Sequence, residues 1–156
     1  MNKTLLTAAL VIGGATLFAG DVFRFRGDNS QGIFEEKGLL KTWPQEGLTP
    51  KWICSGLGEG WSSVIKVGNF LYTTGSDMSS KPRKETVVCL DLVGKLIWQT
   101  ATGARWERSY PGARCTPTFV PGEKEGEGRL VVSTGPGEVY CLNAADGKIL
   151  WSKAVS

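Results

Sequence analysis

The sequence contains no histidine among its 156 residues. Histidine is the usual general base and the most frequent neutral metal ligand in proteins. Its absence excludes, within this chain, catalytic triads built on histidine and zinc sites ligated by histidine. The chain also has little net charge, because its 18 basic residues nearly balance its 15 acidic ones. Neither sign forms a long run. This balance argues against a nucleic-acid-binding tail.

Glycine and proline are abundant instead, with 21 glycines and 7 prolines in the chain. Their sum is well above the usual share in globular proteins. Such a composition favours many tight turns and argues against a helix bundle or a coiled coil.

The first twenty residues have the layout of a secretory signal peptide. Lys3 precedes an uncharged apolar run, Leu5–Phe18, and two small residues, Ala19 and Gly20, follow it. The run is shorter than the roughly 20 residues that a membrane-spanning helix needs. We therefore predict that residues 1–20 are removed, that no membrane span remains, and that the protein is exported as a periplasmic, cell-surface-associated or secreted protein. A retained N-terminal anchor helix is the alternative.

An internal repeat runs through the remainder of the chain. Residues 87–98 align with residues 139–151 with one gap, and six of twelve paired positions are identical. The similarity continues upstream, where residues 62–75 align with residues 115–135. A period of about 40 to 50 residues built from short strands is the size of one β-propeller blade.

Each copy predicts four strands that are separated by turn residues. Gly94-Lys95 and Asp146-Gly147 stand where the last hairpin of each copy reverses, and glycine supplies the positive φ that such turns need. The predicted strands cover residues 62–67, 70–74, 86–91 and 95–100 in the first copy and 116–120, 129–134, 138–142 and 148–152 in the second.

The repeated pattern of a small residue, then Asp or Asn, then Gly-Lys-x-x-Trp resembles the tryptophan-docking motif of the pyrroloquinoline-quinone-like (PQQ-like) β-propellers. The segment 25–33 is also similar to the opening of exported members of that family. The resemblance implies that an indole of one blade docks against a turn glycine of the next. The residues that match this docking role are Trp52, Asp91, Gly94, Trp98, Asn143, Gly147 and Trp151.

The resemblance implies an all-β fold, a β-propeller of four-stranded antiparallel blades, whose full ring has eight blades. We expect two complete blades and one closing strand here, because a propeller needs at least four blades to close. The chain is then the N-terminal part of a longer protein, or several copies assemble into a ring. The expected divisions are the signal peptide, an N-terminal extended segment (21–50), an orphan closing strand (51–54), blade 1 (55–104) and blade 2 (105–156).

A candidate recognition loop joins the two predicted blades. Arginine beside aromatic side chains is the composition expected of a recognition surface. A solvated loop whose Arg114 pairs with a carboxylate of a neighbouring blade is the alternative. The candidate residues are Trp61, Arg105, Trp106, Arg108, Tyr110 and Arg114.

The four cysteines suggest packing rather than chemistry. Cys89 and Cys141 occupy the same repeat position in mid-strand, where burial as small apolar side chains is expected. No two cysteines are adjacent, so the paired-cysteine disulfide of several quinoprotein dehydrogenases is absent. A bond between Cys54 and Cys115 is possible in an exported protein.

The sequence favours a non-enzymatic scaffold or binding module over an enzyme, with no catalytic residue, no metal ligand and no cofactor predicted. Expected partners are proteins or a small ligand at the propeller face, and missing blades of the same protein or further copies of the chain. Nucleic acid is not expected. The alternative is a fragment of a quinoprotein alcohol or sugar dehydrogenase, which would need PQQ and calcium.

Overall fold

The computed structural model describes residues 20–34, 36–123 and 127–155, and the regular structure in them consists of strands alone. Within these residues, no helix has the length and apolar character needed to span a membrane. Apart from Gly20, the predicted signal peptide lies outside the described residues.

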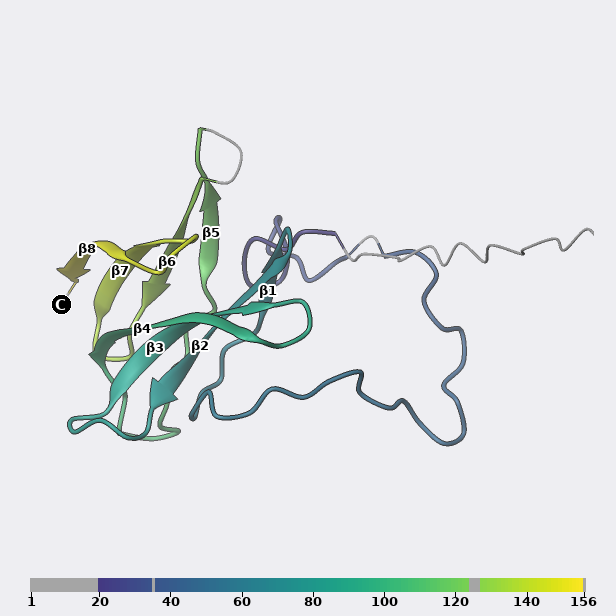
Figure 1. Cartoon of the computed structure of the whole chain (residues 1–156), viewed down its shortest axis with the longest axis horizontal. Helices are drawn as coiled ribbons and strands as arrows, with labels where there is room; N and C mark the ends of the chain where they lie inside the picture. The colour runs from purple at the N-terminus through teal and green to yellow at the C-terminus, as the bar shows by residue number, and fades with distance from the viewer. Residues whose placement is uncertain (1–19, 35, 124–126, 156) are drawn as a thin grey trace, which may run out of the picture.

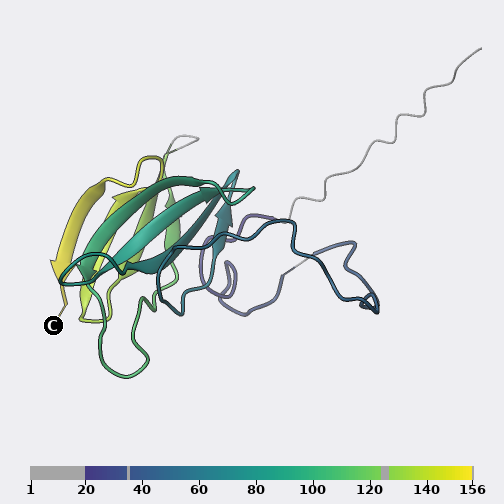
Figure 2. The same ribbon diagram turned by 60° about the horizontal axis from the view of Figure 1, so that its bottom comes forward.

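Eight strands form two four-stranded antiparallel sheets, each with its strands in sequence order. The first sheet, blade 1, contains β1 (Ile65–Val67), β2 (Phe70–Asp77), β3 (Lys84–Asp91) and β4 (Leu96–Ala104). The second, blade 2, contains β5 (Thr118–Pro121), β6 (Gly128–Ser133), β7 (Glu138–Asn143) and β8 (Ile149–Ala154). The two sheets lie side by side (Figures 1 and 2), which confirms the predicted all-β fold of propeller-type blades. The described residues do not close a ring.

The inner strands β1 and β5 begin later than the sequence pattern predicts, because the residues before β1 pair with blade 2 instead. The backbone N–H of Trp61 donates to the carbonyl of Ala113 at 2.7 Å, and the N–H of Ser63 donates to Thr116 Oγ1 at 3.0 Å. These residues precede the inner strands of both blades. Their backbone groups form hydrogen bonds between the blades. The hydrogen-bonded ladder within each blade therefore starts two or three residues later than the sequence pattern predicts.

The segment 51–54, the predicted orphan closing strand, does not pair with another strand among the described residues, and its place in a blade stays a prediction. A strand exists only through a hydrogen-bonded neighbour, and no described backbone group pairs with these residues. Residues 36–50, which precede blade 1 in the sequence, form a long loop that extends away from the two sheets (Figure 1).

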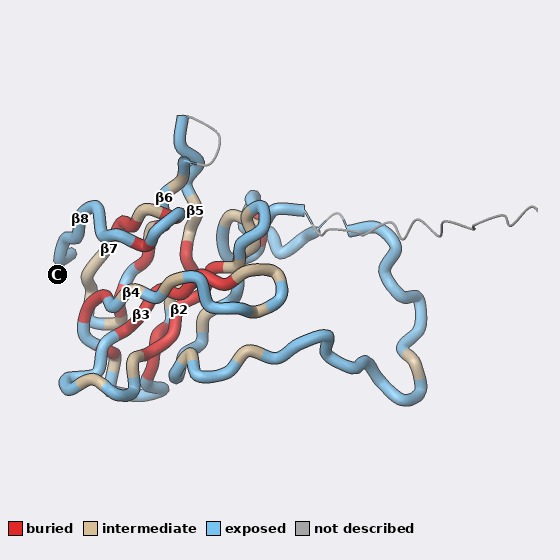
Figure 3. The backbone as a smooth tube through the Cα atoms, viewed as in Figure 1, coloured by how far each residue is buried: buried red, intermediate tan, exposed pale blue. Residues whose placement is uncertain are grey.

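The hydrophobic core lies between the two blades, as the buried residues in Figure 3 show. Side chains from one face of each sheet interdigitate there and exclude water, which is the main favourable contribution to folding. The core residues are Ile65, Tyr72, Val87 and Cys89 from blade 1 and Leu130, Val132, Leu142 and Ala144 from blade 2.

The N-terminal segment connects the two inner strands. The N–H of Val22 donates to the carbonyl of Lys66 in β1 at 2.7 Å, and the carbonyl of Phe23 accepts from the N–H of Phe119 in β5 at 2.7 Å. The rings of Phe23 and Phe119 lie 5.6 Å apart between their centroids. Two consecutive residues thus bind both blades along their otherwise unpaired inner edges.

Candidate functional site

The loop between β4 and β5 is folded back on itself by its own residues. The N–H of Gly112 donates to the carbonyl of Trp106 at 3.0 Å. Tyr110 has a φ of 51°, and Gly112 has a φ of 112° and lies so close to Glu59 that a Cβ would stand 2.8 Å from its carbonyl oxygen. The Tyr-Pro-Gly sequence supports this reversal, because proline restricts the chain and glycine tolerates the close approach.

Two arginines lie beside the indole of Trp106. The guanidinium carbons of Arg108 and Arg114 are 5.7 Å and 5.3 Å from its ring centroid, which is within cation–π range. Trp106 Nε1 donates to the carbonyl of Ser109 at 2.9 Å. Arg114 Nη2 also donates to the carbonyls of Ser109 and Tyr110, the latter at 2.7 Å. Among the described residues Arg114 forms no ion pair, so the pairing with a carboxylate that the alternative interpretation expected is not seen there.

Trp61 joins this group from the segment before β1. Its Nε1 donates to the carbonyl of Pro111 at 3.2 Å, and its ring meets that of Tyr110 edge to face with centroids 5.9 Å apart. Both rings are largely in solvent, with 64% of Trp61 and 70% of Tyr110 exposed. The structure therefore gathers five of the six predicted recognition residues into one cluster, which we call the loop surface: Trp61, Trp106, Arg108, Tyr110 and Arg114.

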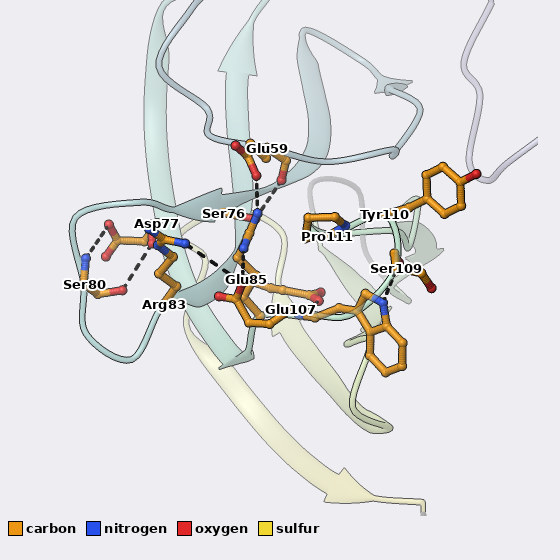
Figure 4. Close-up of polar contacts among 12 residues, drawn as sticks. Glu59, Ser76, Asp77, Ser80, Arg83, Glu85, Glu107, Ser109, Tyr110 and Pro111 are labelled. Atoms are coloured by element: carbon orange, nitrogen blue, oxygen red, sulfur yellow. Dashed lines mark hydrogen bonds and ion pairs between the residues drawn. The ribbon is translucent and has the colours of Figure 1, made fainter.

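Arg105 does not belong to the loop surface, although the sequence grouped it there. Only 4% of it is exposed, and its guanidinium is directed inward, where it forms ion pairs with the carboxylates of Glu59 and Glu107. Arg83 Nη1 lies 4.0 Å from Glu107 on the other side. Figure 4 shows Glu59, Glu107 and Arg83 converging on this point. Arg105 therefore holds the base of the loop through its ion pairs. The exposed cations of the loop are Arg108 and Arg114.

Glu85 anchors the same loop from beneath and was missed in the sequence. Its Oε1 accepts from the N–H of Gly135 at 3.1 Å and from the N–H of Trp106 at 3.4 Å. Burial raises the pKa of its carboxyl, while these two hydrogen bonds and the charges of Arg114 and Arg105 act in the opposite direction. In the sequence, Glu85 is a single glutamate at the start of an apolar strand, and this pattern does not indicate which residues it contacts.

The docking residues contact one another in two equivalent arrangements. Trp52 Nε1 donates to the carbonyl of Leu92 at 3.0 Å, and a Cβ on Gly94 would lie 2.6 Å from its ring. Trp98 Nε1 donates to the carbonyl of Ala144 at 3.2 Å, and a Cβ on Gly147 would lie 2.5 Å from its ring. Leu92 and Ala144 are equivalent positions of the repeat. Each indole therefore covers the same turn of the blade that follows it.

The acidic or amide residue of the motif holds each turn. Asp91 Oδ1 accepts from the N–H groups of Val93 and Lys95, both at 2.9 Å. In blade 2 the turn is one residue longer, and two side chains accept the hydrogen bonds that Asp91 accepts alone in blade 1. Asn143 Oδ1 accepts from Ala145 N at 2.8 Å, and Asp146 Oδ1 accepts from Lys148 N at 3.1 Å. The additional residue explains why asparagine can stand where blade 1 has aspartate.

Trp151 is the exception among the three repeated tryptophans. It is 49% exposed, and no carbonyl among the described residues accepts a hydrogen bond from its indole. Its place on β8 matches that of Trp98 on β4, but no further turn covers it in the part of the chain that the structure describes.

The cysteines and the acidic side chains of the described residues are the other groups that the sequence predictions concern. All four cysteines are free thiols, and burial raises the pKa of the Cys89 thiol to about 11, which leaves it unreactive. Among the described residues, no three His, Cys, Asp or Glu side chains are grouped closely enough to hold a metal ion.

Comparison with known proteins gives one family. Residues 83–156, from the start of β3 to the end of blade 2, match the model of the family described as outer membrane protein assembly factor BamB. No curated protein matches the chain.

Proposed function

We propose that the chain is part of an exported β-propeller of the PQQ-like repeat type, whose BamB family model matches residues 83–156, and that it acts as a non-enzymatic scaffold. In this proposal the loop surface binds a protein partner through an acidic segment. The family description names an outer membrane protein assembly factor, which supports both an exported location and a role in assembly. The predicted signal peptide supports the same location.

The observation that carries this proposal is the chemistry of the loop surface. Glu59 and Glu107 are directed toward Arg105, and Glu85 is buried against backbone N–H groups. Glu59 and Glu107 are therefore paired with a buried arginine, while Arg108 and Arg114 are exposed and form no ion pair among the described residues. A rim with two exposed arginines is complementary to carboxylates.

The exposed rings add the apolar part of the surface. Trp61 and Tyr110 are held by a hydrogen bond and by each other, so little conformational entropy is lost when a partner covers them. Aromatic residues and arginine are the types that most often dominate binding energy at interfaces. The loop surface thus suits a peptide segment that carries both acidic and aromatic side chains.

The alternative dehydrogenase function would need PQQ and calcium, and the acidic side chains of the described residues do not form a group that fits calcium. A calcium site requires several oxygen ligands directed at one point. Two neighbouring carboxylates, those of Glu59 and Glu107, are instead both paired with the Arg105 guanidinium. We derive no catalytic step from this chain.

The test is binding of a fluorescein-labelled peptide of alternating glutamate and tyrosine to the full chain, followed by fluorescence anisotropy. We expect saturable binding that weakens as salt is added, because exposed charges are screened. The double variant Arg108→Ala/Arg114→Ala should bind about tenfold more weakly, since two charged rim contacts are lost.

The matched control is Lys148→Ala/Lys153→Ala, which removes the same charge from exposed positions on blade 2. It should change the affinity by less than about twofold. Equal losses in both double variants would show attraction to net charge alone and would contradict the proposal. Saturable binding of PQQ in the presence of calcium, titrated against the same chain, would favour the dehydrogenase instead.

A further inference from the structure

We propose that a cavity between the two blades binds a small quaternary ammonium cation, a ligand of the type of choline. The cavity has a volume of about 550 Å³, which is within the range of ligand pockets in proteins. It lies at the C-terminal end of β5, whereas the loop surface precedes the N-terminal end of this strand. The two sites share no residue, so this proposal stands or fails independently of the proposed function.

Four separate parts of the chain build the cavity: the N-terminal segment, the β1–β2 turn, the end of β5 and the β7–β8 turn. Hydrogen bonds hold these parts together across the blades. The N–H of Gly68 donates to Asp21 Oδ1 at 2.9 Å, and the hydroxyl of Tyr72 donates to the carbonyl of Ala144 at 3.2 Å. The cavity is therefore formed before a ligand enters, which lowers the entropy cost of binding.

Aromatic rings form the apolar wall of the cavity. The ring centroids of Phe23 and Phe119 are 5.6 Å apart, and those of Phe119 and Tyr72 are 6.4 Å apart. Phe70 extends this row, with its centroid 6.4 Å from that of Tyr72. Gly128 leaves room for the Phe119 ring, because a Cβ at this position would overlap it. Aromatic rings attract cations through their π electrons, and quaternary ammonium groups are bound in this way in many proteins.

The polar part of the lining is acidic. The described residues that line the cavity include the carboxylates of Asp21, Glu123 and Glu127, and they include no lysine or arginine. Lys66 Nζ pairs with Asp21 at 2.9 Å and compensates its charge. Residues 123–127 contain three glutamates against one lysine, so this side of the cavity is negative overall. A concave site with charge of one sign raises the local concentration of ligands of the opposite sign.

The hydrogen-bond acceptors of the wall favour a cation without N–H groups. The carbonyl of Ala144 already accepts from Tyr72 Oη and Trp98 Nε1, both at 3.2 Å. Asp21 Oδ1 already accepts from Lys66 Nζ and from a backbone N–H, both at 2.9 Å. A primary ammonium has three N–H donors, and each costs free energy when it is buried without an acceptor. A quaternary ammonium carries the same charge and needs no acceptor.

The acidic lining also selects against ligands that carry an anion beside the ammonium. Glu123 is exposed, and its carboxylate would repel the phosphate of phosphocholine. A free quaternary ammonium cation is therefore the expected ligand, and a phosphocholine lipid head group is not.

The experiment is an NMR titration of the ¹⁵N-labelled full chain at low salt with choline, with its neutral isostere 3,3-dimethylbutan-1-ol and with phosphocholine. Choline should give saturable shifts of the backbone amides at the cavity, those of Gly68, Asn69 and Ala145. It should bind at least about fivefold more tightly than the neutral isostere, because only choline gains the cation–π and carboxylate attraction. Phosphocholine should bind more weakly than choline.

Two variants separate the contributions of charge and rings. Glu123→Gln should weaken choline binding about threefold and leave the neutral isostere unchanged. Glu46→Gln removes an exposed glutamate that does not line the cavity, and this matched control should leave choline binding unchanged. Phe70→Leu keeps an apolar side chain at a position that is 41% exposed, and it should weaken choline binding about threefold relative to the isostere.

The proposal is overturned if choline causes no saturable shift at the cavity up to about 20 mM, or if choline and its isostere bind equally. Tighter binding of phosphocholine than of choline would also overturn it. Equal losses in Glu123→Gln and Glu46→Gln would show attraction to net charge and would count against this site. The comparison of the three ligands uses the unmodified chain, so it does not depend on the folding of any variant.

Discussion

Blade 1 and blade 2 have the same strand order and closely similar strand sequences, yet they differ sharply in burial. Six consecutive residues of β3 are buried, whereas only Cys141 and Leu142 of the equivalent β7 are, and all six residues of β8 are exposed. Blade 1 lies between blade 2 and the segment 51–58, while blade 2 is covered on one face. Burial in this fold therefore depends on the neighbour of a sheet more than on the sheet itself, as expected for stacked repeats.

The two tryptophans at equivalent positions offer the strongest test of this comparison. Trp98→Ala removes an indole that contacts Tyr72, Gly147 and the carbonyl of Ala144, and it should lower the free energy of unfolding by about 3 kcal/mol. Trp151→Ala should cost less than about 1 kcal/mol, because half of its side chain is already in solvent. Urea unfolding at low protein concentration, followed by circular dichroism, measures both. Equal losses would mean that the neighbouring blade is not the source of the difference.

The two docking glycines give an intermediate effect. Gly147→Ala forces a methyl group into the Trp98 ring at a positive φ and should cost about 2 kcal/mol. Gly94→Ala should cost about 1 kcal/mol, because Trp52 belongs to an unpaired segment that can move away. Gly68→Ala is the control, since Gly68 has a φ of 56° and nothing within 4 Å of its missing Cβ. Its loss measures the backbone cost alone, and the same unfolding experiment applies. A larger loss at Gly94 than at Gly147 would reverse the predicted order of the two docking contacts.

The smallest effect is a pH dependence that has opposite signs at Glu85 of blade 1 and Asp146 of blade 2. Burial raises the pKa of Glu85 above its ordinary value of 4.5, so its stabilising contribution is present below that pH and is lost as the pH rises through the folded pKa. Glu85→Gln should thus gain stability relative to the unmodified chain, by less than about 1 kcal/mol, as the pH increases above 4.5.

Asp146 behaves in the opposite sense. Hydrogen bonds from the backbone and side chain of Lys148 lower the pKa of its carboxyl below the ordinary 3.8. Its contribution is present above that pH and is lost as the pH falls through the folded pKa. The advantage of the unmodified chain over Asp146→Asn should therefore shrink in acid. Thermal unfolding at pH 3 to 7 compares both variants, and slopes of the same sign would contradict the assignment.

The strands could be predicted because their signals are local. Alternating side chains and the turn glycines at Gly94 and Gly147 act over a few residues, and the structure forms all eight strands near the expected positions. The all-β propeller-type fold follows from the same signals together with the repeat.

The remaining features depend on residues that are distant in sequence. Arg105 reads as an exposed cation in the loop sequence, and only the fold shows that Glu59 meets it from 46 positions away. The residues 51–54 carry a strand-like pattern, but no pattern can supply the neighbour that a strand needs. Glu85 has the same difficulty, because its partners Trp106 and Gly135 lie 21 and 50 positions later.

The pairing of Val22 and Phe23 with the two inner strands has a consequence for the order of folding. A ribosome produces these residues early, yet Phe23 meets its partner Phe119 only after both blades have been synthesised. Local hairpins form quickly, whereas contacts between distant residues must first close a long loop. Val22 and Phe23 are therefore expected to reach their final positions last. Their two hydrogen bonds can form together only when both sheets are already side by side.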